Sequence, residues 1–195
     1  MFKPYGIIPP IITPFTEDGR FNEPVFRKMV NHLIHEGVHG VFPLGTTGEF
    51  YAFSDEEVRY ILEVCKDEVA GRVPVYAGAN HITTRGAIRL VHIAEEVGVD
   101  AVSVLTPMFV SQTQDEVYAF YKSVAESTSL PVIVYNNKPK TNVTVTPETI
   151  AKLAEIPNIV GMKDTSGDIT QTFEFIRRTR DTGFKVFGGK DTLLY

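Results

Sequence analysis

Short apolar runs recur along the chain at intervals of roughly thirty residues, separated by longer amphipathic segments, and this repeat strongly restricts the possible folds. Roughly thirty residues is the length of one strand followed by a crossover helix. Most runs have apolar residues at consecutive positions, which is typical of parallel strands covered on both faces. The expected strands are 7–13, 40–44, 73–77, 101–105, 132–135, 159–163 and 185–187.

The segments between these runs carry helix boundary signals. Ser54 with Glu57, and Thr113 with Glu116, have the spacing of capping boxes. Thr146 precedes a proline, a combination that favours the start of a helix. Glycines occur where three helices are expected to end, at Gly37, Gly98 and Gly183.

Seven strands and six intervening helices predict an α/β fold, a (β/α)8 TIM barrel truncated after the seventh strand. An open, doubly wound sheet is the alternative. A complete barrel takes about 250 residues, and this chain has 195. We expect a single barrel domain over residues 1–195 that lacks the eighth strand and the C-terminal helices. Its first and last strands would then have unpaired edges, so it is a fragment or something else closes the gap.

Composition narrows the classes of partner and compartment. Nineteen basic and twenty-four acidic residues give a net charge of -5, so neither nucleic acid nor an anionic membrane surface is an expected partner. The single cysteine, Cys65, lies in a helical pattern and is interpreted as a small buried apolar residue. Without a possible internal disulfide or a signal peptide pattern, we expect a cytoplasmic protein.

Residues suited to chemistry gather where the predicted strands end. The second strand runs into "LGTTGEF", the fifth into "VYNNKPKTN", the sixth into "MKDTSGD" and the seventh into "FGGKDT". In both architectures the carboxyl ends of the strands form the functional face. One shared pocket is therefore expected there.

Strand alternation suggests how the sixth strand presents its lysine. Ile159, Gly161 and Lys163 would share one face, and Ile133 and Tyr135 would share a face of the neighbouring strand. Tyr135 could then contact Lys163 inside the barrel. A lysine at the rim of an apolar interior has its charged form disfavoured, and the neutral amine can form a Schiff base with a carbonyl compound.

An alternative interpretation stays open both for Lys163 and for the loop that contains Thr46 and Thr47. Lys163 could extend to solvent and pair with Asp164. The hydroxyls of Thr46 and Thr47, with backbone N–H groups at a loop-to-helix junction, suit a carboxylate. That loop could instead be a capped turn with no ligand.

The motifs "GTTGE", "VYNN" and "GMKDTSGD", in this order, resemble the dihydrodipicolinate synthase / N-acetylneuraminate lyase family, and the resemblance covers essentially the whole chain. It implies a class I, Schiff-base-forming aldolase or lyase on a (β/α)8 barrel. The implied substrates are a 2-oxo acid, typically pyruvate, and an aldehyde. The resemblance implies no metal and no cofactor, and a homo-oligomer, either a dimer or a tetramer.

The same resemblance implies roles for individual residues. Lys163 would be the Schiff-base nucleophile, Tyr135 the general acid and base, and Thr46 a member of the proton relay. Thr46 and Thr47 would hold the carboxylate of the 2-oxo acid. The further substrate-binding positions are Lys140, Thr165 and Gly189.

Departures from the family pattern bear on the reaction. Phe109 stands where synthases have a tyrosine that completes a relay across a dimer, and Lys140 stands where they have an arginine. Both favour a related pyruvate aldolase, for a sugar acid or another 2-oxo acid, over the synthase itself, and Thr46 replaces the serine usual in the sialic acid branch. A catalytically silent truncated barrel, acting in binding or assembly or being an incomplete gene product, is the alternative function.

Overall fold

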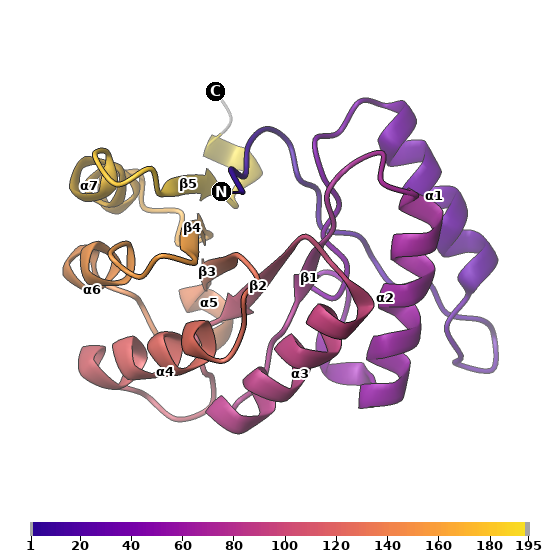
Figure 1. Ribbon diagram of the computed structural model, residues 1–195, viewed down its shortest axis with the longest axis horizontal. Coiled ribbons are helices and arrows are strands. Elements are labelled where there is room, and N and C mark those ends of the chain that lie inside the picture. Colours follow the sequence, from indigo (N-terminus) through magenta and orange to yellow (C-terminus); the bar gives the residue numbers. More distant parts are fainter. Residues whose placement is uncertain (1, 194–195) are drawn as a thin grey trace.

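A row of parallel strands forms the centre of the structure, a computed structural model that describes residues 2–193 (Figure 1). The regular sheet has five strands in chain order, and each neighbouring pair is parallel. The predicted α/β class with a parallel sheet is therefore confirmed. The strands are β1 (Tyr76–Gly78), β2 (Ala101–Leu105), β3 (Val132–Asn136), β4 (Ile159–Asp164) and β5 (Lys185–Gly188).

The first two predicted strands are wrong as regular strands. Segment 7–13 pairs with segment 40–44 through one bridge, Pro10 to Phe42, and 40–44 pairs with the segment before β1 through another, Val41 to Val75. Both bridges are parallel, so the two segments continue the row of strands beyond β1. Regular ladders are interrupted because prolines have no N–H to donate, and these segments contain Pro9, Pro10 and Pro43.

The helices form an arc around the outside of the strands (Figure 1). Its long members are α1 (Glu23–His35), α2 (Asp55–Val69), α3 (Thr84–Val97), α4 (Gln114–Glu126), α6 (Pro147–Leu153) and α7 (Ile169–Thr179). Short turns of helix add η1 (Phe50–Ala52), α5 (Lys138–Thr141) and η2 (Asp191–Leu193). Within residues 2–193, none of the helices has the length and apolar character that crossing a bilayer requires.

Most predicted helix boundaries are confirmed. Ser54 and Thr113 each form a complete capping box, and the Thr146 side chain caps the start of α6. Gly98 ends α3 in the left-handed conformation, at φ 78°. Gly183 does not end a helix, because the last residue of α7 lies four positions earlier.

Apolar side chains fill both faces of the sheet, which explains the consecutive apolar residues of the strands. The larger core lies between the strands and the helices and includes Phe26, Tyr121 and Phe175. The smaller cluster lies on the inner face and comprises Phe42, Tyr76, Ala101, Ile133 and Val160. Fully burying each large apolar side chain contributes about 1.5–3 kcal/mol, so this layering stabilises the curved row of strands.

Cys65 belongs to the larger core, on α2, and is fully buried. Burial raises the pKa of its thiol to about 12. Because only the thiolate is an effective nucleophile, the interpretation of Cys65 as a packing residue is supported.

A β-bulge interrupts β4 and corrects one prediction. Val132 pairs with Ile159, but the next residue, Ile133, pairs with Gly161, so Val160 is an extra residue. Ile159 packs in the helix-side core and Val160 in the inner cluster. The expectation that Ile159 shares a face with Gly161 and Lys163 is wrong, because the bulge shifts the alternation by one position.

Both ends of the row of strands have open edges within the described residues. There, β5 pairs only with β4, and segment 7–13 pairs only with 40–44. Helix α7, which lies beside β5, exposes three apolar side chains: Ile169 is 48% exposed, Phe173 63% and Ile176 44%. A further strand and helix would cover such surfaces in a closed barrel.

Gly78 allows the closest approach between β1 and the end of segment 40–44. A Cβ built on Gly78 would lie 1.9 Å from the Leu44 carbonyl oxygen. We expect Gly78→Ala to lower the free energy of unfolding by about 2 kcal/mol, because backbone atoms must move apart. Gly188→Ala is the control, since nothing lies within 4 Å of its Cβ position. Urea denaturation of both variants measures the difference, and equal stabilities would contradict this packing.

Candidate active site

Tyr135 and Lys163 lie side by side at the carboxyl ends of β3 and β4. They are register partners in the parallel pair. The Lys163 Nζ atom lies 4.7 Å from the centroid of the Tyr135 ring and 4.9 Å from that of the Phe42 ring. The contact that the sequence predicts between Tyr135 and Lys163 is therefore present, and Phe42 completes an aromatic enclosure around the amine.

The Lys163 side chain is half-buried, and its amine lies over the faces of two aromatic rings. These rings give the amine an apolar wall, and their faces can also attract a cation. An incoming carbonyl carbon would meet an amine held against aromatic surfaces rather than one extended into solvent.

Among the described residues Asp164 does not pair with Lys163, so the ion pair suggested in that alternative is wrong. Its buried carboxylate accepts hydrogen bonds from Asn136 Nδ2 at 2.9 Å, Ser166 N at 3.1 Å, Ser166 Oγ at 3.0 Å and Thr172 Oγ1 at 2.6 Å. These donors come from β3, from the loop after β4 and from α7. The carboxylate thus fixes the chain on either side of the lysine from the opposite face of β4.

The Tyr135 hydroxyl receives hydrogen bonds from two sides. Thr46 Oγ1 donates across 3.4 Å, and Asn137 Nδ2 donates across 2.9 Å. The tyrosine is 3% exposed, so neither contact competes freely with bulk water. Because both neighbours donate, the phenol keeps its own proton available for transfer.

The loop 45–49 brings Thr46 and Thr47 to the same end of the sheet. Its turn is closed by the Gly48 N–H, which donates to the Gly45 carbonyl at 3.0 Å. Thr13 Oγ1 donates to the Gly48 carbonyl at 2.8 Å, which ties the loop to the first segment. Within residues 2–193 the N–H groups of Thr46 and Thr47 have no acceptor, so both remain available to an anion.

One expectation about this loop is wrong. The loop does not lead directly into an α-helix but into η1, a single 3-10 turn, and α2 begins only at Asp55. No helix dipole of useful length therefore points at the loop. Any carboxylate bound here would depend on the backbone N–H groups and the Thr47 hydroxyl, because the Thr46 hydroxyl donates to Tyr135.

Gly189 and Thr165 border Lys163. The Gly189 N–H donates to the Asp164 carbonyl at 2.7 Å, and a Cβ at position 189 would lie 3.0 Å from Lys163 Cε and 2.1 Å from Thr165 Oγ1. A side chain at 189 would therefore displace both neighbours. Thr165 Oγ1 is buried and has no hydrogen-bond partner among the described residues, an arrangement that costs about 1–3 kcal/mol unless a ligand satisfies the hydroxyl.

The remaining candidate residues are less enclosed. Lys140 lies exposed on α5, and Thr47 is also exposed. Within the described residues, the Lys140 side chain forms no hydrogen bond with Lys163 or Tyr135. Phe109 is 95% exposed and has a left-handed backbone, at φ 81°.

Sequence reasoning missed two residues that contact the site, Asn137 and Phe42. Asn137 is two positions after Tyr135, and residues at this spacing share a strand face. That spacing was the available signal for a contact with the phenol. Phe42 lies in an apolar run whose inner and outer faces the sequence does not distinguish, so its contact with Lys163 had no comparable signal.

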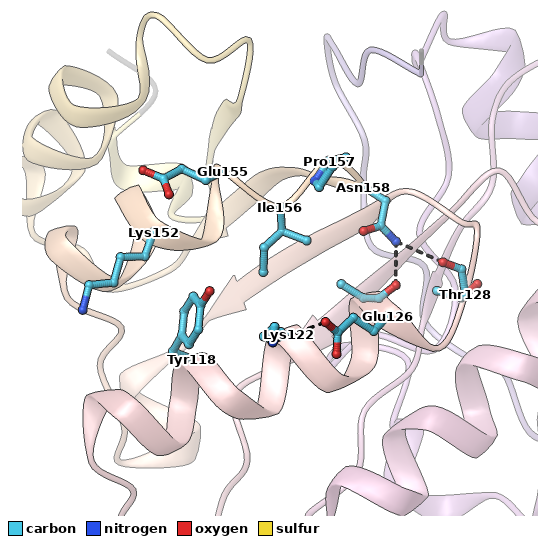
Figure 2. Close-up of a pocket in the computed structure, with 10 residues that line it drawn as sticks. Tyr118, Lys122, Glu126, Thr128, Lys152, Glu155, Ile156, Pro157 and Asn158 are labelled. Carbon is cyan, nitrogen blue, oxygen red and sulfur yellow. Dashed lines mark hydrogen bonds and ion pairs between the residues drawn. The ribbon is translucent and has the colours of Figure 1, made fainter.

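A surface hollow of about 490 Å³ lies between α4 and the segment before β4, away from this site (Figure 2). It is at the amino end of β4, whereas Lys163 is near the carboxyl end. Asn158 at its edge donates to the Ala125 and Thr128 carbonyls, and Lys122 pairs with Glu126. Because it lies at the end of β4 opposite Lys163, the hollow is not the candidate active site.

Known proteins match both the sequence and the fold. The family model described as "Dihydrodipicolinate synthetase family" matches residues 3–195. The 4-hydroxy-tetrahydrodipicolinate synthase of Syntrophus aciditrophicus is 43% identical over 191 residues, which are 98% of this chain and 64% of that protein. The chain therefore spans just under two thirds of the length of this relative.

Solved structures of proteins from the same family also match the fold of this chain. A dihydrodipicolinate synthase from Bacillus anthracis matches with a TM-score of 0.95 and 37% identity over 98% of this chain and 66% of that one. YagE, a prophage protein of the dihydrodipicolinic acid synthase family from E. coli K12, solved in complex with pyruvate, matches with a TM-score of 0.92 and 34% identity, over 95% of this chain and 63% of that one. With a family model that covers nearly all of its residues, the chain belongs to the dihydrodipicolinate synthetase family.

Proposed function

We propose that the chain carries the Schiff-base machinery of an aldolase or lyase that acts on pyruvate or a related 2-oxo acid. The observation that carries this proposal is the placement of the Lys163 amine 4.7 Å from the Tyr135 ring centroid, with the phenol hydroxyl held by Thr46. A related protein, YagE, is described in complex with pyruvate. The family to which the chain belongs supports the same chemistry.

The proposed reaction begins at Lys163. The neutral amine adds to the keto carbon of pyruvate, and Tyr135 gives a proton to the departing hydroxyl, so that water leaves and a protonated imine remains. The protonated imine withdraws electrons from the adjacent methyl carbon, which loses a proton to the Tyr135 phenolate and forms an enamine. The enamine carbon then attacks an aldehyde, whose oxygen takes that proton from Tyr135. Hydrolysis of the resulting imine, with the released proton returning to Tyr135, frees the product and restores the lysine amine.

The 45–49 loop is proposed to hold the carboxylate of the 2-oxo acid. The N–H groups of Thr46 and Thr47 and the Thr47 hydroxyl supply donors on the tyrosine side of the site, while the Thr46 hydroxyl donates to Tyr135. Bound there, the carboxylate would orient the keto carbon toward the amine, and such orientation lowers the entropic cost of addition. Thr165 Oγ1, which is buried without a partner among the described residues, is the donor proposed for the remainder of the substrate.

A second candidate function is assembly rather than catalysis. Within the described residues, β5 and segment 7–13 each have one unpaired edge and α7 exposes apolar side chains, which favours this candidate. A strand and helix from another polypeptide would pair with the edges and cover Phe173. Such a partner could also complete the wall of the catalytic site, so the two candidates are not exclusive.

Covalent trapping tests the aldolase proposal. Borohydride reduction in the presence of pyruvate should increase the mass of the peptide containing Lys163 by that of pyruvate less one oxygen atom. Lys163→Met should abolish the increase, because within residues 2–193 the amine recorded over the Tyr135 ring is that of Lys163. Lys190→Met, two residues beyond β5, is the matched control and should label like the parent protein. An unlabelled Lys163 with intact folding would contradict the proposal.

Substitution of Lys140 tests whether this residue binds a carboxylate group on the acceptor aldehyde. An arginine binds a carboxylate through two parallel hydrogen bonds, which a lysine cannot do. Lys140→Arg should therefore raise kcat/KM severalfold for an aldehyde that carries a carboxylate, and leave it unchanged for an uncharged aldehyde. Lys138→Arg on the same short helix is the control. Equal effects on both aldehydes would remove Lys140 from acceptor binding.

The assembly candidate is tested by the mass of the particle in solution. Light scattering after size-exclusion chromatography should show association of the parent chain, and Phe173→Glu should yield a smaller particle, because a charge on α7 opposes burial. Val25→Glu, at an exposed position on α1, should leave the mass unchanged. A parent protein that is monomeric at all concentrations would exclude self-association through this surface.

A further inference from the structure

The side chain of Asn137 makes a contact that its position in the chain does not require. Asn137 is the N-cap residue of α5, a place where asparagine usually bonds to the helix backbone. Here the side chain makes no capping hydrogen bond. Instead, Nδ2 donates to the Tyr135 hydroxyl across 2.9 Å. Both residues are buried, at 5% and 3% exposure, so water does not replace this bond freely.

The backbone holds Asn137 in the position that makes this contact. Its carbonyl accepts hydrogen bonds from Lys140 N at 2.9 Å, Thr141 N at 3.1 Å and Thr141 Oγ1 at 3.2 Å. Thr106 Oγ1 in turn donates to Thr141 Oγ1 at 3.0 Å. A hydrogen-bonded turn therefore holds the Asn137 amide beside the phenol. Because the turn is already fixed, the bond costs little conformational entropy.

We propose that Asn137 is a positioning residue that acts through Tyr135, by donating a hydrogen bond that stabilises the phenolate left after proton transfer. This inference rests on the proposed Schiff-base function. Asn137 and Thr46 both donate to the phenol oxygen, so neither of these contacts uses the phenol O–H as its donor. Tyr135 then gives its proton to the departing hydroxyl, and the two donors stabilise the negative charge that forms.

The first arm of the test measures imine formation. Asn137→Val removes the donor without adding charge, and should slow borohydride-trapped imine formation roughly tenfold. It should also move the alkaline limb of the pH profile to higher pH, because the phenol becomes the weaker acid. Asn137→Asp has the shape of asparagine but places a carboxylate beside the phenol, and should be slower still.

This order of rates separates a hydrogen-bonding role from packing. If Asn137 only filled space, the isosteric Asn137→Asp would be the milder change and neither variant would move the pH profile. Asn158→Ala is the matched control, because Asn158 directly precedes β4, at the end away from Lys163, and its side-chain amide donates to the backbone carbonyls of Ala125, Thr128 and Leu130. It should lower stability and leave the pH profile in place.

The second arm does not depend on activity. In protein labelled with 13C at tyrosine Cζ, with the Tyr135 signal assigned by Tyr135→Phe, the Asn137→Val variant should show a Tyr135 titration midpoint displaced to higher pH. An unmoved midpoint overturns the proposal, whatever the rates. If the parent protein traps no pyruvate, the Schiff-base function fails, and the midpoint still decides whether Asn137 controls the phenol.

Discussion

The parallel pairing of β3 with β4 is the constraint on which the candidate site depends. In that register Tyr135 lies opposite Lys163, and the amine rests 4.7 Å from the phenol ring. The bulge at Val160 is part of the same constraint, because it resets the alternation of β4 before the lysine is reached. A register different by one residue would turn Lys163 toward the helices and away from Tyr135.

Polar groups on the outer side of the strand ends keep this pairing in place. The buried Asp164 carboxylate joins the ends of β3 and β4 to the start of α7, while Lys163 faces the other way. Because the two side chains lie on opposite faces of β4, the Asp164 carboxylate can hold the loops without forming an ion pair with the Lys163 amine. Around it, the 45–49 loop contributes donors without a helix dipole, and Gly189 leaves space beside the lysine stem.

Features formed by neighbouring residues in the chain were predictable from the sequence. Features that depend on a second strand or on a distant side chain were not. The capping boxes at Ser54 and Thr113 are complete within four residues, so the chain alone specifies them. The bulge at Val160 arises between two strands, and no pattern within β4 indicates it. The donor role of Asn137 was missed because asparagine after a strand usually indicates a turn or cap. Segments 7–13 and 40–44 were expected as strands because apolar content outweighed the effect of their prolines.

The central claim is that Lys163 and Tyr135 together form a covalent site for a 2-oxo acid. A crystal structure of the chain after exposure to pyruvate tests it most directly. The account predicts continuous electron density from Lys163 Nζ to the keto carbon, with the carboxylate on the Thr46 and Thr47 N–H groups. A free Lys163 side chain beside pyruvate bound elsewhere, or not bound at all under saturating conditions, would contradict it.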